Sequence, residues 1–388
     1  MTGPSEFNQE PFVVEFDDAS VDDLRARLRA TIWPDQLSDS GWEYGTDLAY
    51  IRELCDHWAE RFDWDRFRGR ANAHPQMVTE IDGERIHAVH ARSPEPDALP
   101  LIISHGWPGS IAELWDVIGP LSDPRAHGAD PADAFHVIAP SLPGYGFSGP
   151  TRHRGINAAA IATRFASLMQ GLGYDRYAAQ GGDWGALITT ELAHQHPNRV
   201  TAIHLNLLNC PAPPRDRLFD GVTDAERDDL ARARRFQAHE TGYQAIQSTK
   251  PQTVAYGLTD SPAGLAAWIV EKFHTWSDCH GDLDSLLTRD RLLDNITIYW
   301  LTRTINSSMR LYYETIGPDR AKPPSRVTVP TGHARFPAEI YKAPRAWAEA
   351  WYPIDHWVDM PRGGHFAAME VPDLFVADVR TYFRTHRP

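Results

Sequence analysis

The sequence predicts an α/β protein with a doubly wound, mostly parallel sheet, an N-terminal extension and a helical insertion. From Leu99 onward, short apolar runs ending in Gly, Pro or Ser alternate with helical stretches, as in βαβ units. Between two proline-rich breaks, at 211–214 and 323–324, the alternation stops and the chain is almost wholly helical in pattern. In such a sheet, the ligand site lies beyond the carboxyl ends of the strands.

The patterns divide the chain into four segments. Residues 1–98 are expected to form an extension of helices and a hairpin that packs on the core. Residues 99–213 and 325–388 are expected to form the two parts of the α/β core, and residues 214–324 a helical lid between them. An insertion of this kind is typical of a lid over an active site.

Local signals predict the elements of the extension. Ser20 and Asp23 resemble a capping box for a first helix, which Trp33-Pro34 is expected to end. A second helix is expected at 46–62, and a hairpin turns at Asp82-Gly83.

The composition limits the classes of function. A net charge of −14 without basic clusters argues against a nucleic-acid partner. The three cysteines are widely separated, which favours a reducing compartment. The N-terminus resembles no signal peptide, and no run approaches the roughly 18–20 apolar residues that cross a bilayer. We therefore expect a cytoplasmic protein without a membrane anchor.

The stretch QGGDWG, residues 180–185, has the form of a nucleophile elbow with aspartate at its centre. An apolar run precedes it and a helical pattern follows, which is the context that the motif requires. Asp183 is the candidate nucleophile. The alternative is that Asp183 only caps the helix that follows.

Two further motifs complete the constellation in the chain order of the α/β-hydrolase fold. His365, in RGGHF after the last predicted strand, is the candidate base, and Glu339, after the preceding strand, is the candidate acid. Asp355 and Asp359 lie nearer to His365 in sequence, but within the last predicted strand, so Glu339 is favoured over them.

The motif HGWPG, residues 105–109, follows the first core strand. In this fold that loop supplies one N–H group of the oxyanion hole. We therefore expect the backbone N–H groups of Trp107 and Trp184 to form the hole.

An aspartate nucleophile indicates displacement at a saturated carbon. Serine would form an ether there, which activated water does not release, whereas aspartate forms an ester that water can attack at the acyl carbon. With a reference pKa of roughly 3.9, Asp183 needs no base to become ionised. Alkyl halides and epoxides both fit. An epoxide oxygen needs an acid, and Tyr243, Tyr312 or Tyr313 of the helical segment could supply it, although each tyrosine taken alone is more typical of a packing residue.

The combined motifs resemble the microsomal-type epoxide hydrolases over nearly the whole chain. The N-terminal resemblance lies in LRARLRATIWPDQL and in the stretch from FDWDRF to HAVHARS, and the later motifs are HGWPG, GGDWG, GYQAIQSTKP, IYWLTRTINSSMRLYYE, RFPAEI and RGGHFAAMEVP. The resemblance implies Asp183 as nucleophile, Glu339 as acid and His365 as base. It also implies that Tyr243 and Tyr312 are the two lid tyrosines that bind the epoxide oxygen.

The resemblance further implies what the protein acts on. The partners are a small epoxide and water, with no cofactor and no metal. Without an anchor, the chain looks like the soluble bacterial branch, some members of which open aryl-type epoxides in secondary metabolism, including enediyne antibiotic pathways. A homodimer through the extension or lid is compatible with the sequence, which carries no signal for it. The rival hypotheses are a haloalkane dehalogenase and a non-catalytic binding protein of the same fold.

Overall fold

Nine strands form one sheet in the computed structural model, which describes residues 7–318 and 326–387. Residues 1–6 and the predicted break at 323–324 lie outside the described residues. The strand order is β1-β2-β3-β5-β4-β6-β7-β8-β9. The pairs from β1 to β5 are antiparallel, and those from β5 to β9 are parallel, so the predicted mostly parallel sheet is confirmed. The strands are β1 Gln9–Phe12, β2 Gln76–Ile81, β3 Glu84–Ala91, β4 Leu99–Ser104, β5 Phe135–Pro140, β6 Tyr177–Gly181, β7 Val200–Leu205, β8 Thr331–Arg335 and β9 Ile354–Asp359.

The central strands are apolar because both of their faces are covered. Leu101, Ile103 and Val137 have no exposed surface, and every residue of β6 is buried. Helix α5 packs on α6, and α4 packs on α16, so two helix pairs cover the sheet. The helices of this part of the chain are α4 Trp115–Ser122, α5 Ala158–Gly171, α6 Trp184–Gln195, α14 Arg345–Trp351, α15 Ala367–Glu370 and α16 Pro372–Phe383.

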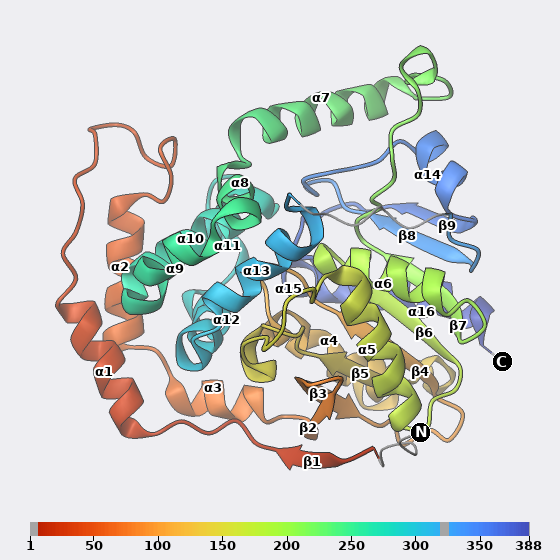
Figure 1. The fold of residues 1–388 in the computed structure, drawn as a ribbon, viewed down its shortest axis with the longest axis horizontal. Helices are drawn as coiled ribbons and strands as arrows, with labels where there is room; N and C mark the ends of the chain where they lie inside the picture. The colour runs from red at the N-terminus through yellow and green to blue at the C-terminus, as the bar shows by residue number, and fades with distance from the viewer. Residues whose placement is uncertain (1–6, 319–325, 388) are drawn as a thin grey trace.

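Between β7 and β8 the chain first runs as loop and turn and is then mainly helical from Asp224 to Ile316, and we call α7 to α13 the lid helices. Figure 1 shows α8 to α13 gathered beside the sheet, with α7 extending from them toward α14. None of the helices described in the chain is both long and apolar enough to cross a membrane. The lid helices are α7 Asp224–His239, α8 Gly242–Thr249, α9 Pro251–Asp260, α10 Pro262–Trp276, α11 Leu283–Leu286, α12 Arg289–Thr302 and α13 Ile305–Ile316.

The N-terminal extension packs on the lid helices as well as on the sheet. Helices α1 (Asp18–Arg29) and α2 (Leu48–Glu60) contact α10, and α2 also contacts α12 (Figure 1). The short helix α3 (Trp64–Ala71) leads into the hairpin of β2 and β3, which turns at Asp82-Gly83 as predicted. Because β3 pairs with β5, the hairpin continues the central sheet.

In the extension, the bounds of the first helix differ from the prediction, and one strand was not predicted. Asp17, not Ser20, caps α1: its side chain accepts a hydrogen bond from the Ser20 N–H at 2.8 Å. The helix therefore begins earlier than the capping-box pattern suggests, and it ends at Arg29, before Trp33-Pro34. Strand β1 was not predicted, because its four residues gain their hydrogen bonds only by pairing with the distant β2.

Candidate active site

The turn between β6 and α6 holds Asp183 in a strained backbone conformation. Its φ of 50° and ψ of −126° lie outside the regions that non-glycine residues favour. Small neighbours are required here, because a Cβ on Gly185 would overlap the Ser104 carbonyl group. Although Asp183 stands at the N-cap of α6, its side chain makes no capping hydrogen bond. The alternative that it is merely a helix cap is therefore excluded.

The Asp183 carboxylate lies against the loop that follows β4. Its Oδ1 accepts a hydrogen bond from the Trp107 N–H at 2.7 Å. The approach is so close that a Cβ on Gly106 would overlap the Asp183 side chain. Of the two N–H groups expected for an oxyanion hole, the one from Trp107 thus reaches the carboxylate. Trp184 is the next residue along the chain and begins α6.

His365 lies between Asp183 and Glu339. Its Nε2 is 3.4 Å from Asp183 Oδ2, and its Nδ1 is 2.7 Å from Glu339 Oε1. Both His365 and Glu339 are buried, and Glu339 Oε1 also accepts a hydrogen bond from the Ile340 N–H. The structure thus brings the three predicted triad residues together from three separate loops.

The two rival carboxylates lie elsewhere. Asp359 pairs with Arg335 at 2.6 Å, and Asp355 pairs with His386 at 3.1 Å. Both come from β9, whose residues alternate in direction along the strand. Neither contacts His365 in the part of the chain that the structure describes.

The carboxylates control the charge of His365. Burial alone would lower the pKa of this imidazole, but the charges of Glu339 and Asp183 outweigh burial and hold its pKa well above the ordinary value. The two carboxylates thus favour the protonated form of His365 in the free protein.

Two lid tyrosines face the catalytic loops. Tyr243 on α8 stacks on the Trp107 ring at 5.3 Å, and Tyr312 on α13 meets the edge of Trp184 at 4.7 Å. Burial raises the pKa of both hydroxyls, so they stay protonated and can donate. Tyr312 is 3% exposed, whereas its neighbour Tyr313 is 39% exposed. Tyr312 is therefore the one that faces the site.

A small cavity of about 20 Å³ borders Asp183, His365 and Trp107. It is large enough for about one water molecule. Glu113 also lines it, and burial raises the pKa of this carboxyl group to about 8, an effect that His365 opposes and Asp183 strengthens. Glu113 was not among the predicted site residues, because a lone glutamate on a predicted helix is usually solvated.

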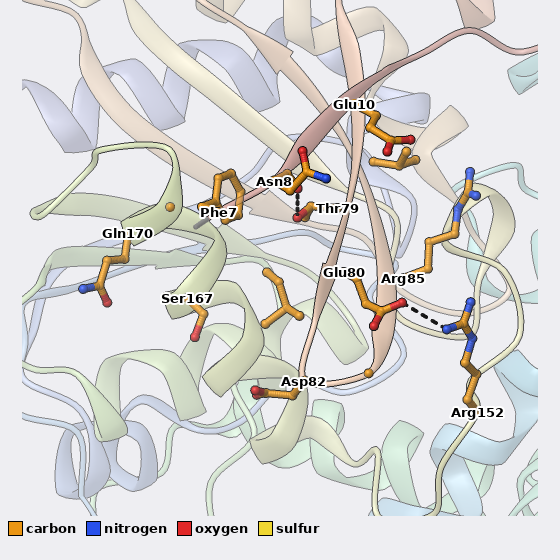
Figure 2. A pocket seen from close by; sticks show the side chains of 14 residues that line it. Phe7, Asn8, Glu10, Thr79, Glu80, Asp82, Arg85, Arg152, Ser167 and Gln170 are labelled. Atoms are coloured by element: carbon orange, nitrogen blue, oxygen red, sulfur yellow. Dashed lines mark hydrogen bonds and ion pairs between the residues drawn. The ribbon is translucent and has the colours of Figure 1, made fainter. Parts of the chain in front are cut away.

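A larger cavity lies away from the candidate catalytic residues. Its volume is about 760 Å³, and it lies between β2 and α5 (Figure 2). Its lining is polar and includes the exposed Glu80–Arg152 ion pair, and no candidate catalytic residue reaches it. Nor do the described residues include a cluster of His, Cys, Asp and Glu that could hold a metal ion.

Three features together define a class of protein, the α/β hydrolases. They are the strained turn at Asp183, the N–H donor of Trp107 and the chain order of Asp183, Glu339 and His365. The family model described as alpha/beta hydrolase fold matches residues 100–248. The model described as epoxide hydrolase N terminus matches residues 9–114.

Individual relatives narrow the class. A protein of Stigmatella aurantiaca (strain DW4/3-1), whose name assigns it provisionally as an epoxide hydrolase, is 45% identical over 97% of this chain and 85% of its own length. Epoxide hydrolase 1 of Sus scrofa is 38% identical over 96% of this chain and 88% of its own. The crystal structure of juvenile hormone epoxide hydrolase from the silkworm Bombyx mori superposes with a TM-score of 0.91 at 33% identity, covering 100% of this chain and 96% of that one. The chain belongs to the epoxide hydrolase family.

Proposed function

We propose that this protein hydrolyses an apolar, aryl-type epoxide to a vicinal diol through a covalent ester of Asp183. One observation supports the proposal most directly. The Asp183 carboxylate accepts a hydrogen bond from the Trp107 N–H at one oxygen and faces His365 at the other. The buried Tyr243 and Tyr312 lie close enough for its charge to act on their hydroxyls. An aryl substrate is supported by the indole rings around this site. A role in secondary metabolism, a cytoplasmic location and a homodimer stay predictions from the sequence.

The first step opens the ring. One oxygen of Asp183 attacks an epoxide carbon, and the carbon–oxygen bond on the far side breaks. Tyr243 and Tyr312 hydrogen-bond the epoxide oxygen, and a tyrosine proton passes to it as it leaves. This requirement for an acid favours an epoxide over an alkyl halide, because a halide leaves without a proton.

Ester formation also prepares the second step. Once Asp183 is esterified, one of the two negative charges that raise the pKa of His365 is gone. The imidazole then gives the proton that it holds in the free protein to solvent and can act as a base; it regains that proton from solvent once the Asp183 carboxylate is restored. Oriented by Glu339, it takes a proton from water, which attacks the Asp183 acyl carbon. The Trp107 N–H, together with that of Trp184, stabilises the oxyanion that forms.

Isotope labelling tests the ester route. In a single turnover of styrene oxide in heavy-oxygen water, the label should enter the Asp183 carboxylate before it reaches the diol. Mass analysis of the peptide that contains residue 183 measures this. Label found only in the diol would show direct attack by water and would refute the proposal.

Trapping the intermediate tests the role of His365. His365→Gln should accumulate the alkyl-enzyme, detected as an increase in intact mass equal to that of styrene oxide. A folded His365→Gln protein that binds the epoxide without forming this adduct would contradict the assignment.

A matched pair of tyrosine variants tests whether Tyr312 binds the epoxide oxygen. Tyr312→Phe should slow alkylation strongly, whereas Tyr313→Phe should not, because only Tyr312 is buried at the site. Equal effects of the two variants would argue against a hydrogen bond from Tyr312 to the epoxide oxygen.

The two rival functions are separated by assay. Halide release from chloro- and bromoalkanes without epoxide turnover would indicate a dehalogenase. Absence of both reactions in the folded wild-type protein would indicate a binding protein.

A further inference from the structure

A buried lysine lies against one of the two lid tyrosines. Lys272 on α10 is 5% exposed, and its Nζ lies 4.6 Å from the centre of the Tyr243 ring. The same ammonium is 6.0 Å from the Trp268 ring and 5.9 Å from the Trp276 ring. Lysine is rarely buried in proteins unless its charge is compensated. Three ring faces and a carboxylate provide that compensation here.

The carboxylate belongs to the preceding residue. Glu271 Oε2 contacts the Lys272 ammonium, while Glu271 Oε1 accepts a hydrogen bond from Thr275 Oγ1 at 3.2 Å. Glu271 is the more exposed partner, so the ion pair has an outer carboxylate and an inner ammonium. The inner ammonium is the part that faces Tyr243.

The ring opening moves negative charge onto a tyrosine. Asp183 loses its charge when it forms the ester, and the tyrosine that gives its proton to the epoxide oxygen becomes a phenolate. Burial disfavours such a phenolate, and the charges of Asp183 and Glu271 add to the effect, which raises the pKa of Tyr243. A cation over the ring face acts in the opposite direction, and desolvation makes its attraction stronger.

The two lid tyrosines differ in this respect. Among the described residues, no lysine or arginine lies over the Tyr312 ring, whose neighbours are Trp107, Trp184 and Tyr243. The two tyrosines have the same predicted role, but only the Tyr243 ring lies next to a positive charge among the described residues.

We propose that Lys272 is a positioning residue for ring opening, which fixes the Tyr243 ring and makes Tyr243, rather than Tyr312, the proton donor. This inference rests on the proposed epoxide hydrolysis. The Tyr243 proton goes to the epoxide oxygen as the ring carbon–oxygen bond breaks and the bond to Asp183 forms. After water cleaves the ester, the released diol oxygen takes its proton from His365. The Asp183 carboxylic acid that remains returns a proton to the Tyr243 phenolate.

The test compares Lys272→Met, which keeps the apolar stem, with Lys272→Arg, which keeps the charge. In single turnovers of styrene oxide, Lys272→Met should slow alkylation by about tenfold or more and leave the hydrolysis of the ester nearly unchanged. Lys272→Arg should restore most of the alkylation rate. Lys250→Met, at an exposed lysine of the lid, is the matched control and should have no effect.

Double variants separate electrostatics from packing. Lys272→Met should add nothing in a Tyr243→Phe background and should keep its full effect in a Tyr312→Phe background. Glu271→Gln removes the outer carboxylate and should not slow alkylation, whereas a purely structural ion pair would make Glu271→Gln as harmful as Lys272→Met. If Lys272→Met does not fold, Glu271→Gln still distinguishes an electrostatic role of Lys272 from a purely structural ion pair.

Three outcomes would overturn the inference: equal slowing by Lys272→Met with and without Tyr243, slowing by Glu271→Gln, or unchanged alkylation in a folded Lys272→Met protein. A wild-type protein that turns over no epoxide would instead refute the proposed function.

Discussion

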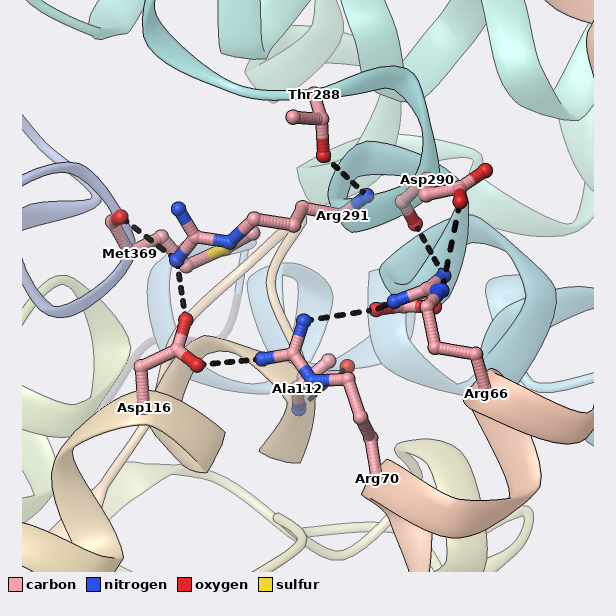
Figure 3. A network of polar contacts seen from close by, with 10 residues as sticks. Arg66, Arg70, Ala112, Asp116, Thr288, Asp290, Arg291 and Met369 are labelled. Carbon is pink, nitrogen blue, oxygen red and sulfur yellow. Dashed lines mark hydrogen bonds and ion pairs between the residues drawn. The ribbon is translucent and has the colours of Figure 1, made fainter. Parts of the chain in front are cut away.

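The active site and an arginine–aspartate network differ in how completely their charged groups are paired. The network lies where the extension, the core and the lid helices meet. The network consists of six residues on α3, α4 and α12: Arg66, Arg70, Asp116, Asp290, Arg291 and Asp294 (Figure 3). At the active site, Asp183 has a strained backbone, and His365 Nε2 and Glu339 Oε2 are buried without a hydrogen-bond partner among the described residues.

Each carboxylate of the network is bridged by at least one guanidinium. Arg66 binds Asp294 with two hydrogen bonds of 2.6 and 2.9 Å, and Arg70 links Asp294 to Asp116. Arg291 binds Asp116 and also donates to the Met369 carbonyl oxygen at 2.9 Å, four residues after His365 (Figure 3). The network thus connects the extension, a core helix, a lid helix and the short helix α15, which follows the candidate base.

The difference shows that the network holds elements of the fold in place, whereas the active site keeps groups that can react. Paired charges with multiple hydrogen bonds fix the relative positions of elements from distant parts of the chain. The strained Asp183 and the incompletely hydrogen-bonded His365 and Glu339 remain available to a substrate. Changes at the site should therefore reduce activity far more than stability, and changes in the network should do the reverse.

The largest expected effect is at Asp183. Both Asp183→Ala and Asp183→Gly should lose activity by a factor on the order of 10⁴ or more, because no ester can form. In urea unfolding, Asp183→Gly should be more stable than Asp183→Ala by about 1 kcal/mol, the reverse of the usual order, because only glycine accepts this backbone without strain. Equal stability of the two variants would show that the turn is not strained.

The next effect is in the network. Burial raises the pKa of Asp294 to about 6, although Arg66 and Arg70 oppose the shift. Asp294→Ala leaves both arginines without their shared partner and should reduce the free energy of unfolding by about 3 kcal/mol. Asp290→Ala, on the same helix but partly exposed, is the control and should cost clearly less. If both variants cost the same in urea unfolding, burial does not determine the strength of the network.

A smaller effect concerns pH. Burial lowers the pKa of His87 to about 3, helped by the charge of Arg85. Below about pH 6.5 the unfolded chain binds a proton at this position and the folded chain does not, so stability falls as the pH falls. From pH 7 to pH 5, His87→Gln should lose about 2 kcal/mol less than the wild type. Identical losses in urea unfolding would mean that His87 is protonated in the folded protein.

The smallest effect should come from an exposed ion pair. Arg29 and Glu60 lie 2.9 Å apart, but both side chains are more than half exposed. Arg29→Ala should change the free energy of unfolding by less than about 0.5 kcal/mol, because solvent screens such pairs. If Arg29→Ala reduced the free energy of unfolding as much as Asp294→Ala, burial would not explain the strength of the charge pairs in this protein.

Much of the fold and the candidate triad could be predicted because their signals are local. The apolar runs of β4, β5 and β6 and the hairpin turn at Asp82-Gly83 are continuous in sequence. The glycines on both sides of Asp183 make the elbow recognisable in the sequence. The capping of α1 was predicted wrongly because Ser20 and Asp17 are both good caps, and only the backbone decides between them.

The sequence by itself determined the α/β class, the order of the chemical groups and the family, because these depend on residue types and their spacing along the chain. Only the tertiary structure decided which tyrosine faces the site, which carboxylate reaches His365, and that Lys272 lies over Tyr243. Those outcomes depend on the direction of side chains on elements that meet through folding, and no local pattern encodes that direction.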